Sequence, residues 1–259
     1  MKLTQRTAIL ITAAATWLAL AAPAATASPP SVQGTAGAAK RCITVTATIP
    51  VGTQPSGVAV NPKTNTIYVP NSFDSTVSVI NGRTNTVTTT IPVGSTAIPA
   101  GAAANPKTNT IYVANFDSNT VSVISGRTNT VTATVPVTGP EGVAANPKTN
   151  TIYVGSPEHG TVSVISGRTN TVTATIPVGR SPAGAAADPK TKTIYVTNFD
   201  DGTVSVISGR TNTVTATVPV GIAGTFASPS GVAVDPKTNT AYVANPGDDT
   251  MSVLAPCPK

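Results

Sequence analysis

Hydrophobic and polar residues alternate along this chain in short runs that return at a nearly constant interval. Residues 57–93 show one unit, with apolar or alternating runs at 57–60, 66–69, 76–80 and 86–91. Clusters of Asn, Gly, Pro, Ser and Asp separate these runs. Runs of four to six β-branched residues between turn-forming clusters are typical of strands, and no segment shows helical spacing. The pattern therefore predicts four antiparallel strands in each unit.

The unit is repeated along the chain with a period near 43 residues. The segment Asn61–Val69 recurs almost unchanged, and its tyrosines are Tyr68, Tyr112, Tyr153, Tyr195 and Tyr242. A period of this length with four strands per unit indicates a β-propeller. We expect these tyrosines to fill the core, and we expect the innermost strands to carry small residues because they converge on the axis.

The count of strands predicts how the array closes. There are five sets of the first three strands, and a fourth strand follows only the first four sets. Residues 44–50 read Thr-Val-Thr-Ala-Thr-Ile-Pro and match the fourth strand at 171–177. The predicted fold is all-β, a five-bladed β-propeller of four-stranded antiparallel blades, closed by the N-terminal strand completing the last blade.

The repeated segments resemble a known family. Tyr195-Val-Thr-Asn198, followed by Thr-Val-Ser-Val-Ile and by Asn-Thr-Val-Thr-Ala-Thr, is similar to the YVTN-type β-propeller repeat family over residues 42–255. Members are commonly seven-bladed, so five repeats is a departure. The resemblance implies a secreted or surface-associated binding module and no shared set of catalytic residues.

The N-terminal part does not belong to the repeats. Lys2 and Arg6 precede an apolar run at 8–22, and Ala25-Thr26-Ala27 fits the cleavage rule of secretory signal peptides. The alternative is a membrane anchor, but the run is shorter than the roughly 20 residues needed to span. We expect a signal peptide at 1–27, a flexible lead-in at 28–41, a propeller at 42–259 and a secreted protein without a membrane span after cleavage.

The chain contains two cysteines, Cys42 and Cys257, near opposite ends of the expected propeller. In the predicted closed ring, the last blade takes its third strand from the C-terminus and its fourth strand from the N-terminus, so the turn between these two strands is interrupted. When the two strands are aligned with the intact hairpin at 162–172, the two cysteines occupy neighbouring positions of that turn. A disulfide there would replace the missing link in an oxidising compartment. Two free thiols and a metal-binding pair are the alternatives, although two Cys with a single His make a poor zinc site.

Motifs for catalysis are absent from the sequence. His159 is the single histidine and lies in a Pro-Glu-His-Gly context that indicates a solvated loop. No phosphate-binding loop, dinucleotide fingerprint or metal-ligand spacing is present, and Asn-Phe-Asp segments offer too few oxygens for calcium. We expect no enzyme activity, no cofactor and no metal. A propeller-type lyase or hydrolase is an alternative, and it would need a polar channel mouth.

Comparison of the repeats with one another separates two faces. The connections that follow the second and fourth strands vary between repeats and fall on one rim, as expected where loops carry function or where they simply drift. On this rim we expect a site for an unknown protein or glycan partner. Its candidate residues are Phe73, Asp74, Phe116, Asp117, Glu141, Glu158, His159, Arg180, Phe199, Asp200, Phe226 and Asp248.

The opposite rim is nearly uniform and basic. It predicts an alternative function, binding of nucleic acid or of another polyanion such as an anionic cell-wall polymer. Copying of one ancestral repeat would also explain this charge pattern. We expect a monomer in either case. The candidate residues are Lys63, Arg83, Lys107, Arg127, Lys148, Arg168, Lys190, Arg210 and Lys237.

Overall fold

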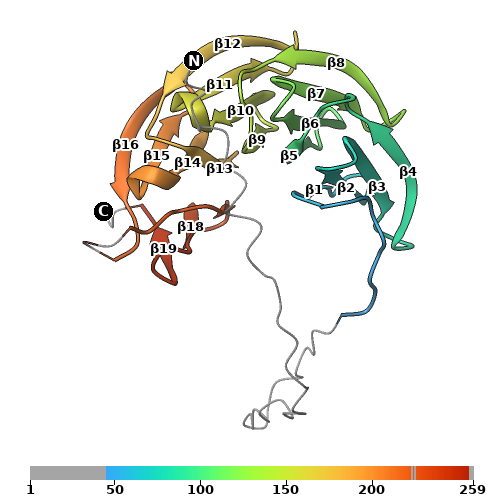
Figure 1. Ribbon diagram of the computed structural model, residues 1–259. Helices are drawn as coiled ribbons and strands as arrows, with labels where there is room; N and C mark the ends of the chain where they lie inside the picture. Colours follow the sequence, from blue (N-terminus) through green and yellow to red (C-terminus); the bar gives the residue numbers. More distant parts are fainter. Residues whose placement is uncertain (1–44, 223, 225, 257–259) are drawn as a thin grey trace, which may run out of the picture. The chain divides into compact units, whose positions relative to one another are not determined.

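The computed structural model describes residues 45–222, 224 and 226–256. The described strands form five antiparallel sheets, each built from strands that follow one another along the chain (Figure 1). The expected signal peptide, the lead-in and both cysteines lie outside the described residues. Across the described ranges, no helix has the length and apolar character needed to cross a membrane.

The first four sheets have four strands each in the described residues. The first contains β1 (Ala59–Asn61), β2 (Thr66–Asn71), β3 (Thr76–Asn81) and β4 (Thr86–Pro92). The second contains β5 (Pro99–Asn105), β6 (Thr110–Asn115), β7 (Thr120–Ser125) and β8 (Thr130–Pro136). The third contains β9 (Val143–Asn146), β10 (Thr151–Ser156), β11 (Thr161–Ser166) and β12 (Thr171–Pro177). The fourth contains β13 (Pro182–Asp188), β14 (Thr193–Asn198), β15 (Thr203–Ser208) and β16 (Thr213–Pro219).

The last sheet contains β17 (Val232–Asp235), β18 (Thr240–Asn245) and β19 (Thr250–Leu254). Two short 3-10 helices, η1 (Pro157–His159) and η2 (Phe199–Asp201), replace the simple loop between the second and third strands of the third and fourth sheets. Each ends at a glycine with positive φ, Gly160 and Gly202. Glycine adopts this conformation without steric cost, so both turns can remain short.

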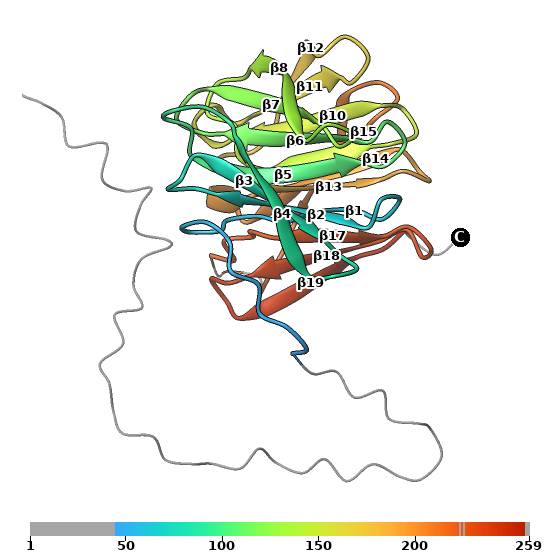
Figure 2. The same cartoon turned by 90° about the vertical axis from the view of Figure 1, so that its right-hand side faces the viewer.

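Burial follows the order of strands within a sheet. The third strand, such as β3, is buried through its centre, whereas the outermost strand β4 is exposed along most of its length. Figure 2 shows β4 on the outer side of the first sheet. Valine and isoleucine occupy the second and third strands of each sheet, whose faces pack against neighbouring sheets, whereas the innermost strands carry mostly small residues. Threonine dominates the outermost strands, where one side is solvated.

The cores lie between consecutive sheets. Tyr68, Val77 and Val79 of the first sheet pack against Ile111 and Val113 of the second. Equivalent clusters join the second sheet to the third, the third to the fourth and the fourth to the last. The prediction of tyrosine as core is confirmed for the first three repeats, since Tyr68, Tyr112 and Tyr153 are fully buried. Tyr195 is half-buried, and Tyr242 is exposed.

The asparagine of the Tyr-Val-x-Asn segments has a structural role in four of the five sheets, and the third sheet has Ser156 at this position. The amide of Asn71 donates to the hydroxyls of Thr76 and Ser78, each at 3.0 Å. Asn115, Asn198 and Asn245 make the same pair of hydrogen bonds in their own sheets. A buried polar side chain is tolerated only when it is hydrogen-bonded. The repeated asparagine therefore ties the second strand to the third.

The last sheet differs from the expectation. Residues 45–50, the described part of the expected closing strand, form no strand and are mostly exposed, and within the described residues the last sheet has three strands. The first and last sheets are not joined there. Pairing of β19 with this segment would link residues about 200 positions apart, so it depends on a non-local contact between the two ends of the array. The closed five-bladed ring therefore stays a prediction.

Candidate functional site

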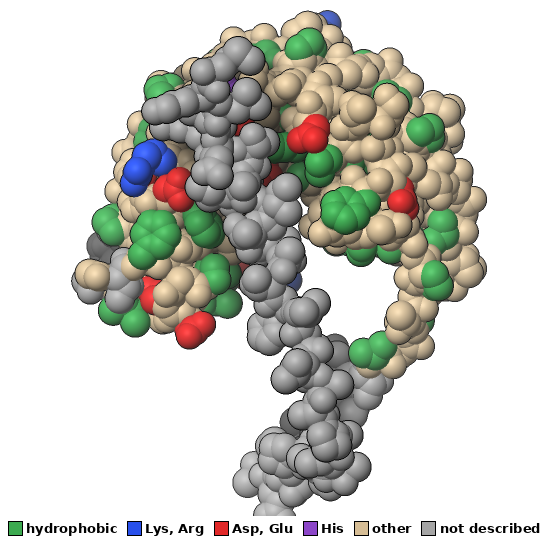
Figure 3. Space-filling model, in the orientation of Figure 1, with side chains coloured by type: hydrophobic (Ala, Val, Ile, Leu, Met, Phe, Trp, Pro, Cys, Tyr) green, Lys and Arg blue, Asp and Glu red, His purple; other side chains and the backbone are tan. Residues whose placement is uncertain are grey.

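The strand register places the variable connections on one face. Asn71, Thr76 and Pro92 lie side by side at one end of the first sheet, and the other sheets repeat this alignment. We call this end the variable face. It comprises the loops at 72–75, 116–119, 157–160, 199–202 and 246–249, the connections at 52–56, 93–98, 137–142 and 178–181, and the described residues of the connection at 220–231. Figure 3 shows a side of the molecule on which several separate Asp and Glu side chains are exposed.

Aspartate carboxylates join the loops of this face to the preceding connection by accepting hydrogen bonds from its backbone. Asp74 accepts a hydrogen bond from the backbone N–H of Thr53 at 2.6 Å. Asp248, at the equivalent loop position, accepts from the backbone N–H of Ile222 at 2.6 Å. A carboxylate with charge-assisted hydrogen bonds to the backbone shapes its own loop. Two of the predicted ligand-binding residues, Asp74 and Asp248, therefore hold the loops in place.

Arg180 and Asp201 form an ion pair on the same face. The guanidinium Nε of Arg180 donates to Oδ1 of Asp201 at 2.6 Å, and its backbone N–H donates to Oδ2 at 2.7 Å. The backbone and side-chain hydrogen bonds from Arg180 lower the pKa of Asp201, and the side-chain hydrogen bond to Asp201 raises the pKa of Arg180. The neighbouring Asp200 accepts from the hydroxyl of Ser181. Sequence reasoning selected Arg180 and Asp200 and missed Asp201, whose equivalence to Asp74 in the loop could have revealed it.

Two of the four predicted phenylalanines come together. The rings of Phe199 and Phe226 lie 6.2 Å apart, edge to face, although their positions are 27 residues apart in the sequence. Phe226 remains 54% exposed, and Phe73 on the first sheet is 70% exposed. Phe116 is half-buried near Gly139. Exposed aromatic rings on loops that ion pairs and hydrogen bonds hold in place are typical of a surface that binds a partner.

Glu141 has an unusual place among the acids. It lies two residues before the innermost strand β9, and its backbone N–H donates to the carbonyl of Gly155 at 2.9 Å. Partial burial of the carboxyl raises its pKa to about 7. The equivalent residues of the other sheets are Ser56, Ala100, Ala183 and Ser230. Asp117, Glu158 and His159 are exposed instead.

The opposite end of the sheets carries the predicted polyanion-binding residues. We call it the basic face, comprising the turns at 62–65, 82–85, 106–109, 126–129, 147–150, 167–170, 189–192, 209–212 and 236–239. Every Lys and Arg that the sequence selected for this face is exposed. Asn61 fixes the backbone of Lys63 by accepting its N–H at 3.1 Å, and Asn81 accepts from the N–H of Arg83 at 2.8 Å. The same arrangement in other repeats gives the cations a regular spacing.

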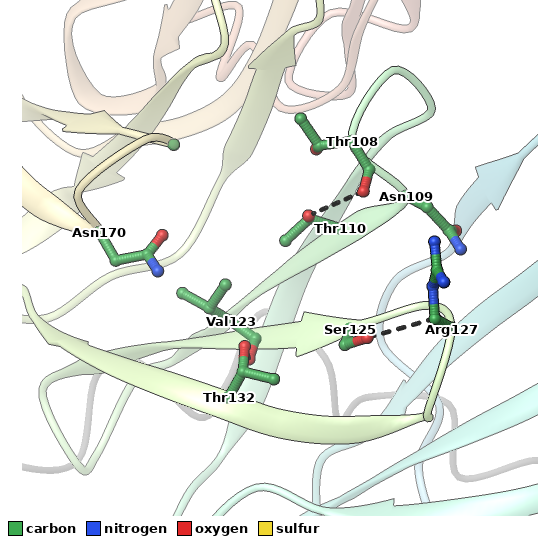
Figure 4. A pocket seen from close by; sticks show the side chains of 9 residues that line it. Thr108, Asn109, Thr110, Val123, Ser125, Arg127, Thr132 and Asn170 are labelled. Carbon is green, nitrogen blue, oxygen red and sulfur yellow. Dashed lines mark hydrogen bonds between the residues drawn. The ribbon is translucent and has the colours of Figure 1, made fainter.

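A cavity of about 180 Å³ opens on the basic face between the second and third sheets (Figure 4). Its lining is polar, with hydroxyls from β6, β7 and β8 of the second sheet and the guanidinium of Arg127 at its edge. Asn170 contributes an amide from the third sheet. Among the described residues, no three His, Cys, Asp or Glu side chains gather closely enough to bind a metal ion.

Comparisons with known proteins bear on the fold. No protein-family model matches the chain. A 34-residue segment is 68% identical to the PE-PGRS family protein PE_PGRS18 of Mycobacterium tuberculosis (strain ATCC 25618 / H37Rv), and the match covers 13% of this chain and 7% of that protein. A chain of Kuenenia stuttgartiensis hydrazine synthase is similar in structure, with a TM-score of 0.63 and 18% identity over 83% of this chain and 80% of that chain. This likeness shows the fold alone, an all-β array of repeated blade-like sheets.

Proposed function

We propose that this protein is an exported, non-catalytic binding module of the YVTN-repeat type, and that its variable face holds a protein or glycan partner. The fold that we propose for it is a closed five-bladed propeller, with residues 44–50 as the fourth strand of the last sheet. A disulfide between Cys42 and Cys257 secures this strand. The Tyr-Val-x-Asn segments and the matched terminal strands support this proposal.

The observation that carries the binding function is the exposed aromatic surface around Phe199 and Phe226. The ring contact between them and the Arg180–Asp201 ion pair order two separate connections of the variable face. Exposed Phe226 and Ile222 then present apolar area beside charged groups. Aromatic residues surrounded by polar groups are typical centres of recognition surfaces.

Binding is tested with the exported protein on a glycan array and against a panel of secreted proteins, followed by titration of the strongest ligand. We expect Phe226→Ser to weaken that ligand at least roughly tenfold, as removal of a central aromatic anchor does. Val172→Ser is the matched control, because Val172 is an exposed apolar residue on the outer strand β12. Equal affinities of the wild type and Phe226→Ser would show that the aromatic surface does not bind this ligand.

A second function, polyanion binding, is favoured by the basic face. Its cations are exposed, regularly spaced and free of ion pairs within the described residues, since the ion pair seen there joins Arg180 to Asp201 on the variable face. A polyanion bound there would release counterions, so its affinity should fall steeply with salt. Heparin-column retention at low salt, lost when Arg83, Arg127, Arg168 and Arg210 are changed to Glu, tests this function. Retention that these changes leave intact would contradict it.

A further inference from the structure

Consecutive sheets meet through one repeated close approach of backbone to backbone. A glycine at or near the start of each of the first four innermost strands lies so close to the next sheet that a Cβ there would clash with a backbone carbonyl oxygen. The approaches are Gly57 to Ala100 (2.8 Å), Gly101 to Glu141 (2.2 Å), Gly142 to Ala183 (2.1 Å) and Gly184 to Ser230 (2.1 Å). In every case the carbonyl belongs to the residue before the corresponding glycine of the next sheet.

Two kinds of side-chain contact accompany this approach. At the end of the inner strand, the amide of Asn61 donates to Oδ1 of Asn109 in the next sheet at 2.7 Å. Asn105 donates in the same way to Asn150 at 2.7 Å. The hydroxyl of Tyr68 donates to Oδ1 of Asn129 at 3.3 Å, and Tyr153 repeats this with Asn212 at 3.1 Å. The acceptors lie in turns of the following sheet.

The last sheet presents one half of this contact set, and no other sheet of the described part of the chain packs against that half. A Cβ at Gly231, the corresponding glycine, would meet no atom within 4 Å. Met251 and Val253 of β19 are 64% and 60% exposed, whereas Val121, Val162 and Val204, the counterparts of Met251, are fully buried. We call Gly231, Asp235, Tyr242, Met251 and Val253 the last-sheet face.

The first sheet presents the other half. Ser56 precedes the glycine Gly57, and Asn65 and Asn85 occupy the turn positions that Asn109 and Asn129 occupy in the second sheet. Val58 and Val60 are 61% and 51% exposed on the same sheet. We call Ser56, Val58, Val60, Asn65 and Asn85 the first-sheet face. The two faces thus carry the complementary residues of a single sheet-to-sheet boundary.

We propose that the last-sheet face binds the first-sheet face of the same chain. The carbonyl of Ser56 lies against Gly231, the amide of Asn65 donates to the carboxylate of Asp235, and the hydroxyl of Tyr242 donates to Asn85. Met251 and Val253 are covered by the apolar side chains of the first sheet. This inference rests on the closed ring proposed above and names the contacts that close it, which the strand at 44–50 alone does not supply.

The occupant is the chain's own first sheet for two reasons. Both faces belong to one chain, so their effective concentration is that of a tethered pair, in the millimolar range for suitable linkers, well above that of a second molecule in dilute solution. The segment at 44–50, whose sequence matches the missing fourth strand, leads directly into the first sheet. Pairing of this segment with β19 would bring the first sheet to the last.

A glycine substitution distinguishes a covered face from an open one. We expect Gly231→Ala to lower the melting temperature by several degrees, because the new Cβ would meet the carbonyl of Ser56. Gly57→Ala is the matched control at an internal boundary, where the added Cβ lies 2.8 Å from the carbonyl of Ala100. A melting temperature unchanged by Gly231→Ala, alongside a decrease for Gly57→Ala, would overturn the proposal.

Oxidation of Met251 provides a test on the unaltered protein, because Met1 and Met251 are the two methionines of the sequence. We expect peroxide to oxidise Met251 at least roughly tenfold more slowly in the folded protein than in urea, since oxidation requires exposure. Equal rates would overturn the proposal. Protection that disappears on dilution, together with a dimer in light scattering, would instead assign the occupant to a second copy. Substitutions on the variable face should weaken ligand binding without changing the protection of Met251 from peroxide. Failure of the proposed binding function can therefore be distinguished from failure of the proposed contact between the first and last sheets.

Discussion

Replacement of Glu141 by Gln should stabilise the protein at alkaline pH. Burial raises the pKa of this carboxyl from 4.5 to about 7. Folding therefore favours the neutral form, and the native state loses stability as the pH rises from the unfolded pKa toward the folded one. A difference of this size corresponds to about 3 kcal/mol, as an upper figure, at pH 8 and to less than about 1 kcal/mol at pH 5.

The assay is urea denaturation of the wild type and of Glu141→Gln at pH 5 and pH 8. The difference in unfolding free energy between the two proteins should grow in favour of the variant between these pH values. Glu158→Gln is the control, because Glu158 is exposed on the neighbouring loop. A constant difference between the wild type and Glu141→Gln across this range would refute the assignment of a partly buried carboxyl with a raised pKa at this position.

Other substitutions test the sheets and the chain ends. Asn198→Ala should cost about 1–3 kcal/mol of unfolding free energy, because Thr203 and Ser205 lose a buried partner, whereas Thr217→Ala on the exposed outer strand should change it little. Calorimetry or urea titration measures both. Cys42→Ser should lower the melting temperature and expose one new thiol, and two titratable thiols in the native wild type would exclude the disulfide. Intact-mass analysis of exported protein should give a chain beginning at Ser28, and a product that retains residues 1–27 would contradict cleavage.

The repeat pattern predicted the sheets well because it reports local chemistry. β-branched runs separated by Asn, Gly and Pro turns recur in each unit, and the structure has a strand at each of them from Ala59 to Leu254. Burial of Tyr68, Tyr112 and Tyr153 follows from the same repetition. The ends of the array were less predictable, because what covers Tyr242 depends on a contact between distant parts of the chain.

The candidate site was predicted only in outline. Register alone placed the variable loops together, but it could not show that Asp74 and Asp248 are occupied by backbone hydrogen bonds. The contact between Phe199 and Phe226 depends on how the long connection at 220–231 folds, which composition does not specify. The raised pKa of Glu141 depends on the partial burial of its carboxyl in the folded chain, whereas sequence reasoning treated this residue as an ordinary loop acid.

The central claim, that the variable face binds the partner, is tested most directly by one comparison on the strongest ligand from the array or panel. Isothermal titration would compare the wild type with two multiple variants, one carrying Phe73→Ser and Phe226→Ser and the other carrying Arg83→Glu, Arg127→Glu, Arg168→Glu and Arg210→Glu. We expect the aromatic variant to lose affinity and the arginine variant to bind as the wild type does at physiological salt. Lost affinity in the arginine variant, with binding retained by the aromatic variant, would contradict the claim and move the site to the basic face.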